Sequence, residues 1–182
     1  MPDAGAAARL CSGVASPTPR SLLVVYHSHT GGTAQMAQAA ADGARAAEPA
    51  LAVRLQRAID TGPHDLLAAD GYLFATPENL AAIAGLMKDF FDRCYYPVLG
   101  RIEGRPYSAL VCAGSDGSNA ARQIERIATG WRLKAVAPAL IVCTHAQTPE
   151  AILAPKTLGA DDLARCADAG AAMAAGLALG IF

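Results

Sequence analysis

The stretch VVYHSHTGGTAQMAQAAADGAR (residues 24–45) passes from a β-branched apolar run, through a short polar turn with two glycines, into an alanine-rich segment. The apolar run has the composition of a buried strand, and the alanine-rich segment has the length and pattern of a helix. A buried strand that turns directly into a helix is the first half of a βαβ unit. This stretch therefore predicts an α/β fold.

The rest of the chain repeats the same alternation of strand and helix. Apolar runs of strand length occupy residues 22–26, 51–55, 71–75, 107–113 and 139–144. Helical patterns occupy residues 32–47, 80–95, 118–129 and 160–178, with a shorter one at 63–68. Strands that alternate with helices form parallel sheets with helices on both faces. We predict a doubly wound, five-stranded parallel sheet of order 2-1-3-4-5, with the alternating segment LAVRL at an edge.

Length and composition limit the classes of function. A chain of 182 residues suits one domain, and we expect a flexible leader over residues 1–20 followed by a single domain over 21–182. The net charge of −1 gives no reason to expect a nucleic-acid partner, and no apolar run is long enough to predict membrane insertion. The five cysteines follow no disulfide or metal-binding spacing, which favours reduced thiols in the cytoplasm.

The turn after the first predicted strand has the composition of an anion-binding loop. Backbone N–H groups at a helix N-terminus are unpaired and attract negative charge. Gly31 and Gly32 allow a ligand close to the backbone, and three hydroxyl groups can donate hydrogen bonds, those of Ser28, Thr30 and Thr33. Residues 21–44 contain no lysine or arginine, which disfavours a triphosphate that is cleaved. Either a single phosphate binds here, or the residues only form a capped, tight turn.

Two further loops are expected beside the first one. In a sheet of this order, ligands bind beyond the carboxyl ends of the strands, where the strand order reverses. That rule selects residues 76–82 (TPENLAA) and 113–119 (AGSDGSN), which are rich in small and hydrogen-bonding side chains. The second of these either contacts a ligand or only forms a turn in which Ser118 or Asn119 caps the helix, and the side chain of Asp116 is expected to point away from a ligand.

The sequence resembles the flavodoxin-like superfamily. Its first loop matches the pattern [ST]-x-T-G-x-T at residues 28–33, and ATPENLAAIAGLMKDFFDR (residues 75–93) is similar to a segment of NAD(P)H-dependent FMN reductases and flavodoxin-type quinone reductases. The resemblance implies that the first loop binds the phosphate of FMN and that the other two loops contact the flavin ring. The cofactor-binding residues implied are Ser28, His29, Thr30, Gly31, Gly32, Thr33, Thr76, Pro77, Glu78, Asn79, Leu80, Ala113, Gly114, Ser115 and Gly117.

The resemblance is compatible with two classes of function, an enzyme and an electron carrier. Carrier flavodoxins are strongly acidic and place aromatic residues beside the ring, whereas this chain is nearly neutral and 5% aromatic. We therefore expect an oxidoreductase that takes hydride from NADPH or NADH and passes it through FMN to a small acceptor such as a quinone or a flavin. We assign no catalytic side chain and no metal site. A flavodoxin-type carrier and a non-enzymatic FMN-binding regulatory module are the alternatives.

Three other features carry weaker expectations. Lys88 and Asp92 have the spacing of an ion pair on a helix face. The segment FFDRCYYPVLG (residues 90–100) suits either a subunit interface, in a homo-oligomer such as a dimer or tetramer, or ordinary core packing. His27 and His29 lack the further ligands of a metal site, and His145 is expected on the rim of the site.

Overall fold

The computed structural model describes residues 20–182, so the predicted leader lies outside the described residues except for Arg20. The strands are Ser21–Tyr26 (β1), Ala52–Arg57 (β2), Gly71–Asn79 (β3), Ala82–Ile83 (β4), Pro106–Ala113 (β5), Lys134–Ala135 (β6) and Leu140–Cys143 (β7). The helices are Gly32–Ala47 (α1), Pro63–Leu67 (α2), Gly85–Val98 (α3), Ser118–Gly130 (α4), Pro149–Leu153 (α5) and Ala160–Leu179 (α6), with a 3-10 turn at Ala58–Asp60.

The sheet has the predicted order. Its path is β2-β1-β3-β5-β6, and every pairing along it is parallel. Strand β7 also pairs with β5 in parallel, further along that strand, so β6 and β7 share the fifth position. The short β4 departs from the pattern because it pairs antiparallel with β3. The order 2-1-3-4-5 is thus confirmed, and β2 lies at the edge as expected.

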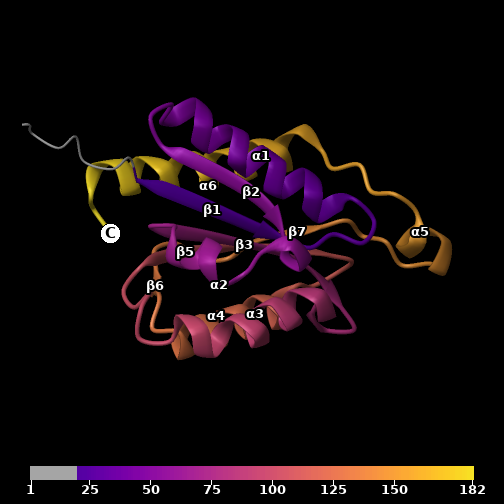
Figure 1. Cartoon of the computed structure of the whole chain (residues 1–182). Helices are drawn as coiled ribbons and strands as arrows, with labels where there is room; N and C mark the ends of the chain where they lie inside the picture. Colours follow the sequence, from indigo (N-terminus) through magenta and orange to yellow (C-terminus); the bar gives the residue numbers. More distant parts are fainter. Residues whose placement is uncertain (1–19) are drawn as a thin grey trace, which may run out of the picture.

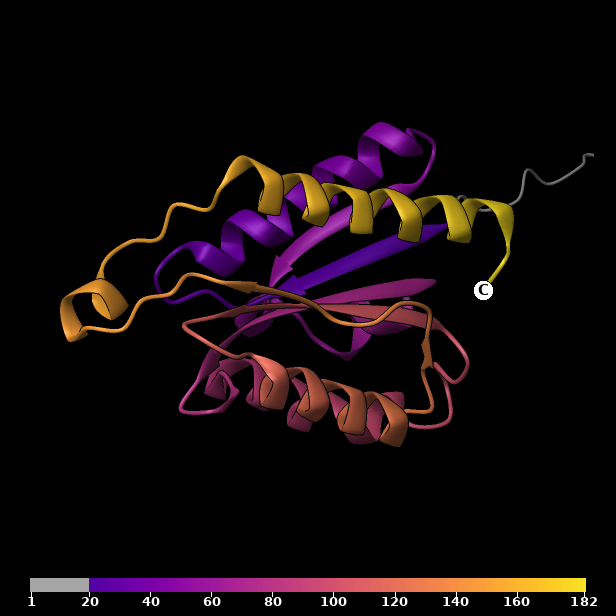
Figure 2. The ribbon, with the colours of Figure 1, turned by 180° about the vertical axis from the view of Figure 1, so that it is seen from behind.

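Helices cover both faces of the sheet. Figures 1 and 2 show α1 and α6 on one face and α3 and α4 on the other. Side chains alternate along a strand, so each strand contributes to both cores. On β3, Tyr72 and Phe74 belong to the core under α3 and α4, whereas Leu73 and Ala75 belong to the core under α1 and α6. In the former core, Phe74 packs edge-on against Trp131 at a centroid distance of 6.4 Å.

Helices α1 and α6 pack unusually closely where they cross. A Cβ atom on Gly170 would lie 1.8 Å from the carbonyl oxygen of Ala40, and one on Gly43 would lie 2.1 Å from that of Ala167. Neither position can hold a side chain unless the helices separate. This contact fixes the position of α1, and with it the position of the loop that precedes α1.

The main departure from the sequence prediction is at residues 80–84, which were expected to begin a helix. Instead β3 continues to Asn79, turns through Leu80 and Ala81 at φ angles of 50° and 57°, and returns as β4. Helix α4 holds this hairpin, because Gln123 accepts a hydrogen bond from the Ile83 N–H at 3.0 Å. Tertiary contacts therefore override the local helical pattern, and α3 begins only at Gly85.

The segment 90–100 contributes Phe90, Phe91, Cys94 and Val98 to the core, and most of its other residues are exposed. Phe90 and Phe91 are buried against Trp131, while Tyr96 is 81% exposed at the end of α3. On the outer face of α3, Lys88 and Asp92 form the expected ion pair at 2.6 Å. None of the helices within residues 20–182 is long and apolar enough to cross a membrane.

Candidate functional site

The first loop presents an open helix N-terminus. Strand β1 ends at Tyr26, and α1 begins at Gly32 after Gly31, whose φ of 91° is left-handed and suits glycine. The Gly31 N–H donates to the Ser28 hydroxyl at 3.1 Å, which closes the turn. Because the N-cap residue is a glycine, no side chain at that position caps the helix. The first N–H groups of α1 therefore remain available to an anion.

One hydroxyl group in this loop is buried without a partner. The side chain of Thr33 is 1% exposed, and its Oγ1 makes no hydrogen bond. Its polar neighbour is the thiol of Cys112, whose pKa is raised by burial and lowered in part by a contact with the Thr33 hydroxyl. A thiol is at most a weak hydrogen-bond partner, so it does not satisfy the hydroxyl. A buried, unsatisfied polar atom costs free energy, and in a native site it points to a bound group. Thr33 thus has an unused hydrogen-bonding capacity at the start of α1.

Gly32 is required by close packing. A Cβ atom at this position would lie 2.7 Å from the sulfur of Cys112 on β5 and 3.4 Å from the Cβ of Lys156. The loop therefore lies directly against the fourth long strand of the sheet on one side and against the segment after β7 on the other.

The second and third loops are joined by Glu78. Its carboxylate accepts hydrogen bonds from the backbone N–H groups of Gly117, at 3.0 Å, and Ala120, at 2.9 Å. Glu78, near the end of β3, therefore caps α4, and the alternative in which Ser118 or Asn119 caps this helix is wrong. The Ser118 hydroxyl instead donates to the exposed carboxylate of Asp116 at 2.6 Å. Glu78 fixes the distance between the end of β3 and the loop that follows β5.

Two more residues hold these loops in place. The hydroxyl of Thr76 is fully buried and accepts a hydrogen bond from the Ala84 N–H at 3.2 Å, across the base of the hairpin. Gly117 has a left-handed φ of 83°, and a Cβ atom there would lie 2.6 Å from Ile141. Thr76 and Gly117 therefore contribute to the site by fixing the conformation of its backbone.

The three loops meet at a cavity of about 80 Å³ beyond the carboxyl ends of β1, β3 and β5. The predicted residues that line it are Ser28, His29, Thr30, Gly32, Thr33, Pro77, Glu78, Asn79, Ala113 and Gly114. The other predicted residues belong to the same loops but lie outside the lining, namely Gly31, Thr76, Leu80, Ser115 and Gly117. Five residues that the sequence analysis did not select also line the cavity, Cys112, Thr144, Ala146, Ile152 and Lys156.

The segment after β7 forms the fourth wall of the cavity. The backbone N–H of Lys156 donates to the Thr30 carbonyl at 2.7 Å, and the Lys156 carbonyl accepts from the Gln35 side chain at 2.6 Å. Gln35 also accepts from the Leu158 N–H at 3.2 Å. The segment has neither a recognisable motif nor a regular pattern, and these contacts join residues more than a hundred positions apart. The sequence alone therefore held no signal for them.

The histidines beside the loop differ in their surroundings. Burial lowers the pKa of His27, and the neighbouring His29 and Arg57 lower it further. His27 is therefore neutral at pH 7. His29 lies in the wall of the cavity, where its ring can face a ligand.

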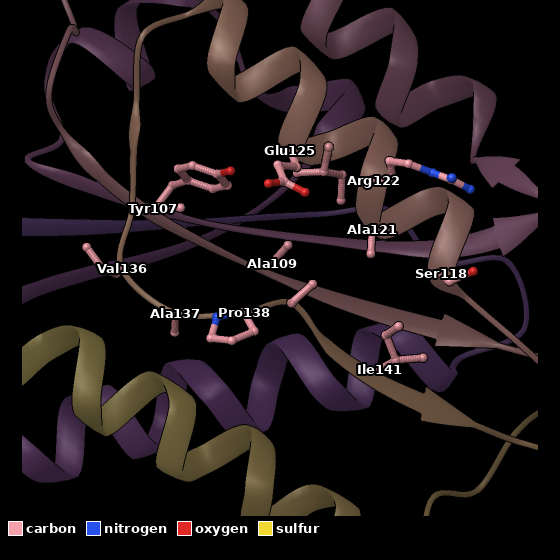
Figure 3. Close-up of a pocket in the computed structure, with 13 residues that line it drawn as sticks. Tyr107, Ala109, Ser118, Ala121, Arg122, Glu125, Val136, Ala137, Pro138 and Ile141 are labelled. Carbon is pink, nitrogen blue, oxygen red and sulfur yellow. The ribbon is translucent and has the colours of Figure 1, made fainter.

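A larger cavity lies elsewhere, a groove of about 840 Å³ between α4 and the edge segment at residues 135–141. Figure 3 shows the residues that line this groove. The groove exists because β6 and β7 are separate, so the backbone at Ala137 and Pro138 moves away from β5. None of the predicted site residues lines this groove, whose lining is mainly apolar but includes Tyr107, Ser118, Arg122 and Glu125.

Comparison with known proteins assigns the family. Residues 52–147, just over half of the chain, match the family described as NADPH-dependent FMN reductase. The chain belongs to this family. The match begins after the first loop, so the phosphate-loop assignment rests on the sequence pattern and the geometry at α1.

Individual relatives agree with this assignment. A flavodoxin from Aquifex aeolicus is 35% identical over 96 residues, which cover 53% of this chain and 51% of that protein. An NAD(P)H dehydrogenase (quinone) from Acidithiobacillus ferrooxidans is 36% identical over 91 residues, which cover 40% of this chain and 46% of that protein. The chain thus spans about half the length of the curated relatives it matches.

The fold of this chain is also similar to that of a solved flavodoxin. A solved structure of a flavodoxin from the domain Archaea superposes with a TM-score of 0.70 at 19% identity, covering 87% of this chain and 99% of that one. The protein therefore has a flavodoxin-like fold.

The residues present fit FMN. The cavity has room for a phosphate group but is far smaller than the roughly 300–1,000 Å³ of pockets that enclose whole ligands. A phosphate there could accept hydrogen bonds from the free hydroxyl of Thr33 and from the first N–H groups of α1. A flavin ring would extend onto the adjoining loops after β3 and β5.

Proposed function

We propose that the protein is an NAD(P)H-dependent oxidoreductase that passes hydride through bound FMN to a small acceptor such as a quinone or a free flavin. The observation that carries this proposal is the unpartnered hydroxyl of Thr33 at a cavity where the three predicted loops meet. When bound, FMN supplies the redox chemistry by accepting a hydride and delivering its electrons to an acceptor.

The protein's own residues hold and orient the cofactor. Ser28, Thr30 and Thr33 bind the phosphate together with the N–H groups of α1. The backbone of the loops at 76–80 and 113–117 contacts the ring, at a separation that Glu78 fixes through its bonds to α4. The proposal names no catalytic acid or base, because hydride transfer to a flavin is chemistry of the cofactor.

The proposal also includes the cellular compartment and the oligomeric state of the protein. The four cysteines that the structure describes are free thiols, which favours a reducing, cytoplasmic environment. Tyr96 and Leu99 are exposed at the end of α3 and would be covered in a homo-oligomer such as a dimer or tetramer.

An electron carrier is the second candidate, because a relative of 35% identity is named a flavodoxin. An anaerobic experiment separates the two. The protein is loaded with FMN, and NADPH and then NADH are added while the flavin absorbance is recorded. Bleaching within seconds supports the reductase and identifies its donor. Bound flavin that neither nucleotide reduces would contradict the reductase and favour a carrier or a regulatory module, and failure to bind FMN would overturn both.

A further inference from the structure

The cavity contains one positive charge that the first loop itself lacks. Lys156 is the one lysine or arginine among the residues that line it. Its backbone is fixed on both sides, because its N–H donates to Thr30 and its carbonyl accepts from Gln35. The first two carbons of its side chain lie 3.4 and 3.6 Å from the position that a Cβ atom of Gly32 would occupy. The stem of Lys156 therefore starts in contact with the N-terminus of α1.

The ammonium group of Lys156 has no acidic partner among the described residues. Its Nζ donates to the carbonyl oxygens of Ala151, Ile152 and Ala154, at 2.7, 2.9 and 2.5 Å. These carbonyls belong to the end of α5, a helix of five residues whose side chains are all exposed. Carbonyl dipoles solvate an ammonium group but do not neutralise it, so the charge is still available to an anion.

Lys156 and Thr33 both line the same small cavity, and the Lys156 ammonium donates its hydrogen bonds to neutral carbonyls. Thr33 contributes a buried hydroxyl without a partner, and Lys156 contributes a cation without a counter-charge. A phosphate ester carries a charge of about −1.5 to −2 at pH 7, which neutral donors alone leave uncompensated. A lysine that reaches the cavity from a segment tied to the loop supplies the missing charge.

We propose that Lys156 is the cation of the phosphate subsite, and that its ammonium group turns from the carbonyls of α5 to the phosphate when the cofactor binds. This proposal rests on the proposed FMN-binding function and deepens it, because it makes the charge of the phosphate a determinant of specificity. Lys156 then selects a flavin mononucleotide over riboflavin, which has the same ring and no phosphate. The carbonyls at the end of α5 lose their donor in the same step.

Binding of FMN and riboflavin to the same variants tests the proposal. Lys156→Gln keeps an amide that can donate to the α5 carbonyls but removes the charge, and Lys156→Arg keeps the charge. Lys88→Gln, at an exposed lysine on α3, controls for the change in net charge. Dissociation constants are measured by flavin fluorescence at fixed ionic strength, and far-ultraviolet circular dichroism checks that each variant is folded.

We expect Lys156→Gln to weaken FMN binding about tenfold or more, with riboflavin binding unchanged. Lys156→Arg and Lys88→Gln should keep the wild-type preference for FMN over riboflavin. The same preference in Lys156→Gln as in wild type would overturn the role of Lys156 and leave the proposed function intact. If Lys156→Gln does not fold, loss of the preference in the charged Lys156→Arg variant would overturn the proposal. A wild-type protein that binds neither flavin would instead refute the proposed function.

Discussion

The side chain of Thr33 allows the phosphate site to be tested separately from stability. Its hydroxyl is buried and its polar neighbour is the thiol of Cys112, so Thr33→Val removes at most one weak contact from the free protein. We predict that the free energy of unfolding stays the same or rises by about 1 kcal/mol. FMN affinity should fall about tenfold or more, because a hydrogen bond to a charged acceptor contributes about 1.5–3 kcal/mol.

Two measurements check this prediction. Urea unfolding followed by the fluorescence of Trp131, the single tryptophan of the chain, gives the stability, and flavin fluorescence gives the affinity. Thr129→Val is the matched control, because Thr129 is exposed on α4 and bonds only to the Glu125 carbonyl. Unchanged FMN affinity in Thr33→Val would remove this hydroxyl from the phosphate site.

The turn at Leu80 and Ala81 holds two side chains in a backbone region that favours glycine. A left-handed conformation costs a non-glycine residue about 1–2 kcal/mol. We predict that Ala81→Gly raises the free energy of unfolding by about 1 kcal/mol, whereas Ala82→Gly, in β4 at the next position, lowers it. Urea unfolding of both variants tests this prediction. Equal changes in the free energy of unfolding would show that the turn is unstrained. The hairpin was not predictable from the sequence, because Leu-Ala is not a turn dipeptide.

Among the elements, those with strong periodicity were predictable. Strands β1, β2, β3, β5 and β7 and helices α1, α4 and α6 lie within a few residues of their sequence-based positions, because buried strands and amphipathic helices leave clear patterns. The two-residue strands β4 and β6 were not predicted. Helix α3 began later than predicted because α4 holds residues 80–84 as a hairpin. The capping of α4 by Glu78 joins residues about 40 positions apart, so no local pattern reveals it.

The crossing of α1 and α6 gives a prediction at the same scale. Gly170→Ala would place a methyl group against the backbone of Ala40, so we expect a loss of about 1–3 kcal/mol or more in the free energy of unfolding. Gly130→Ala at the end of α4 is the control, because nothing lies within 4 Å of its added Cβ. That variant should be neutral or slightly stabilising. The midpoints of thermal unfolding of the two variants test this prediction. Equal shifts of the two midpoints would contradict it.

At the scale of the whole molecule, the sequence predicted those parts of the site whose positions follow from the strand order of the sheet. The switch-point rule placed the loops after β1, β3 and β5 together, and the structure brings ten of the fifteen predicted residues into the wall of one cavity. The fourth wall, formed by the segment that carries Lys156, depends on contacts between Gln35 and residues 156 and 158. Such long-range contacts between irregular segments leave no periodic signal in one sequence.

The position of bound FMN tests the central claim most directly. A crystal structure of the FMN-loaded protein should show the phosphate at the N-terminus of α1, with an oxygen within hydrogen-bonding distance of Thr33 Oγ1, and the ring against the loops after β3 and β5. A flavin bound elsewhere, for example in the groove between α4 and residues 135–141, would contradict the account.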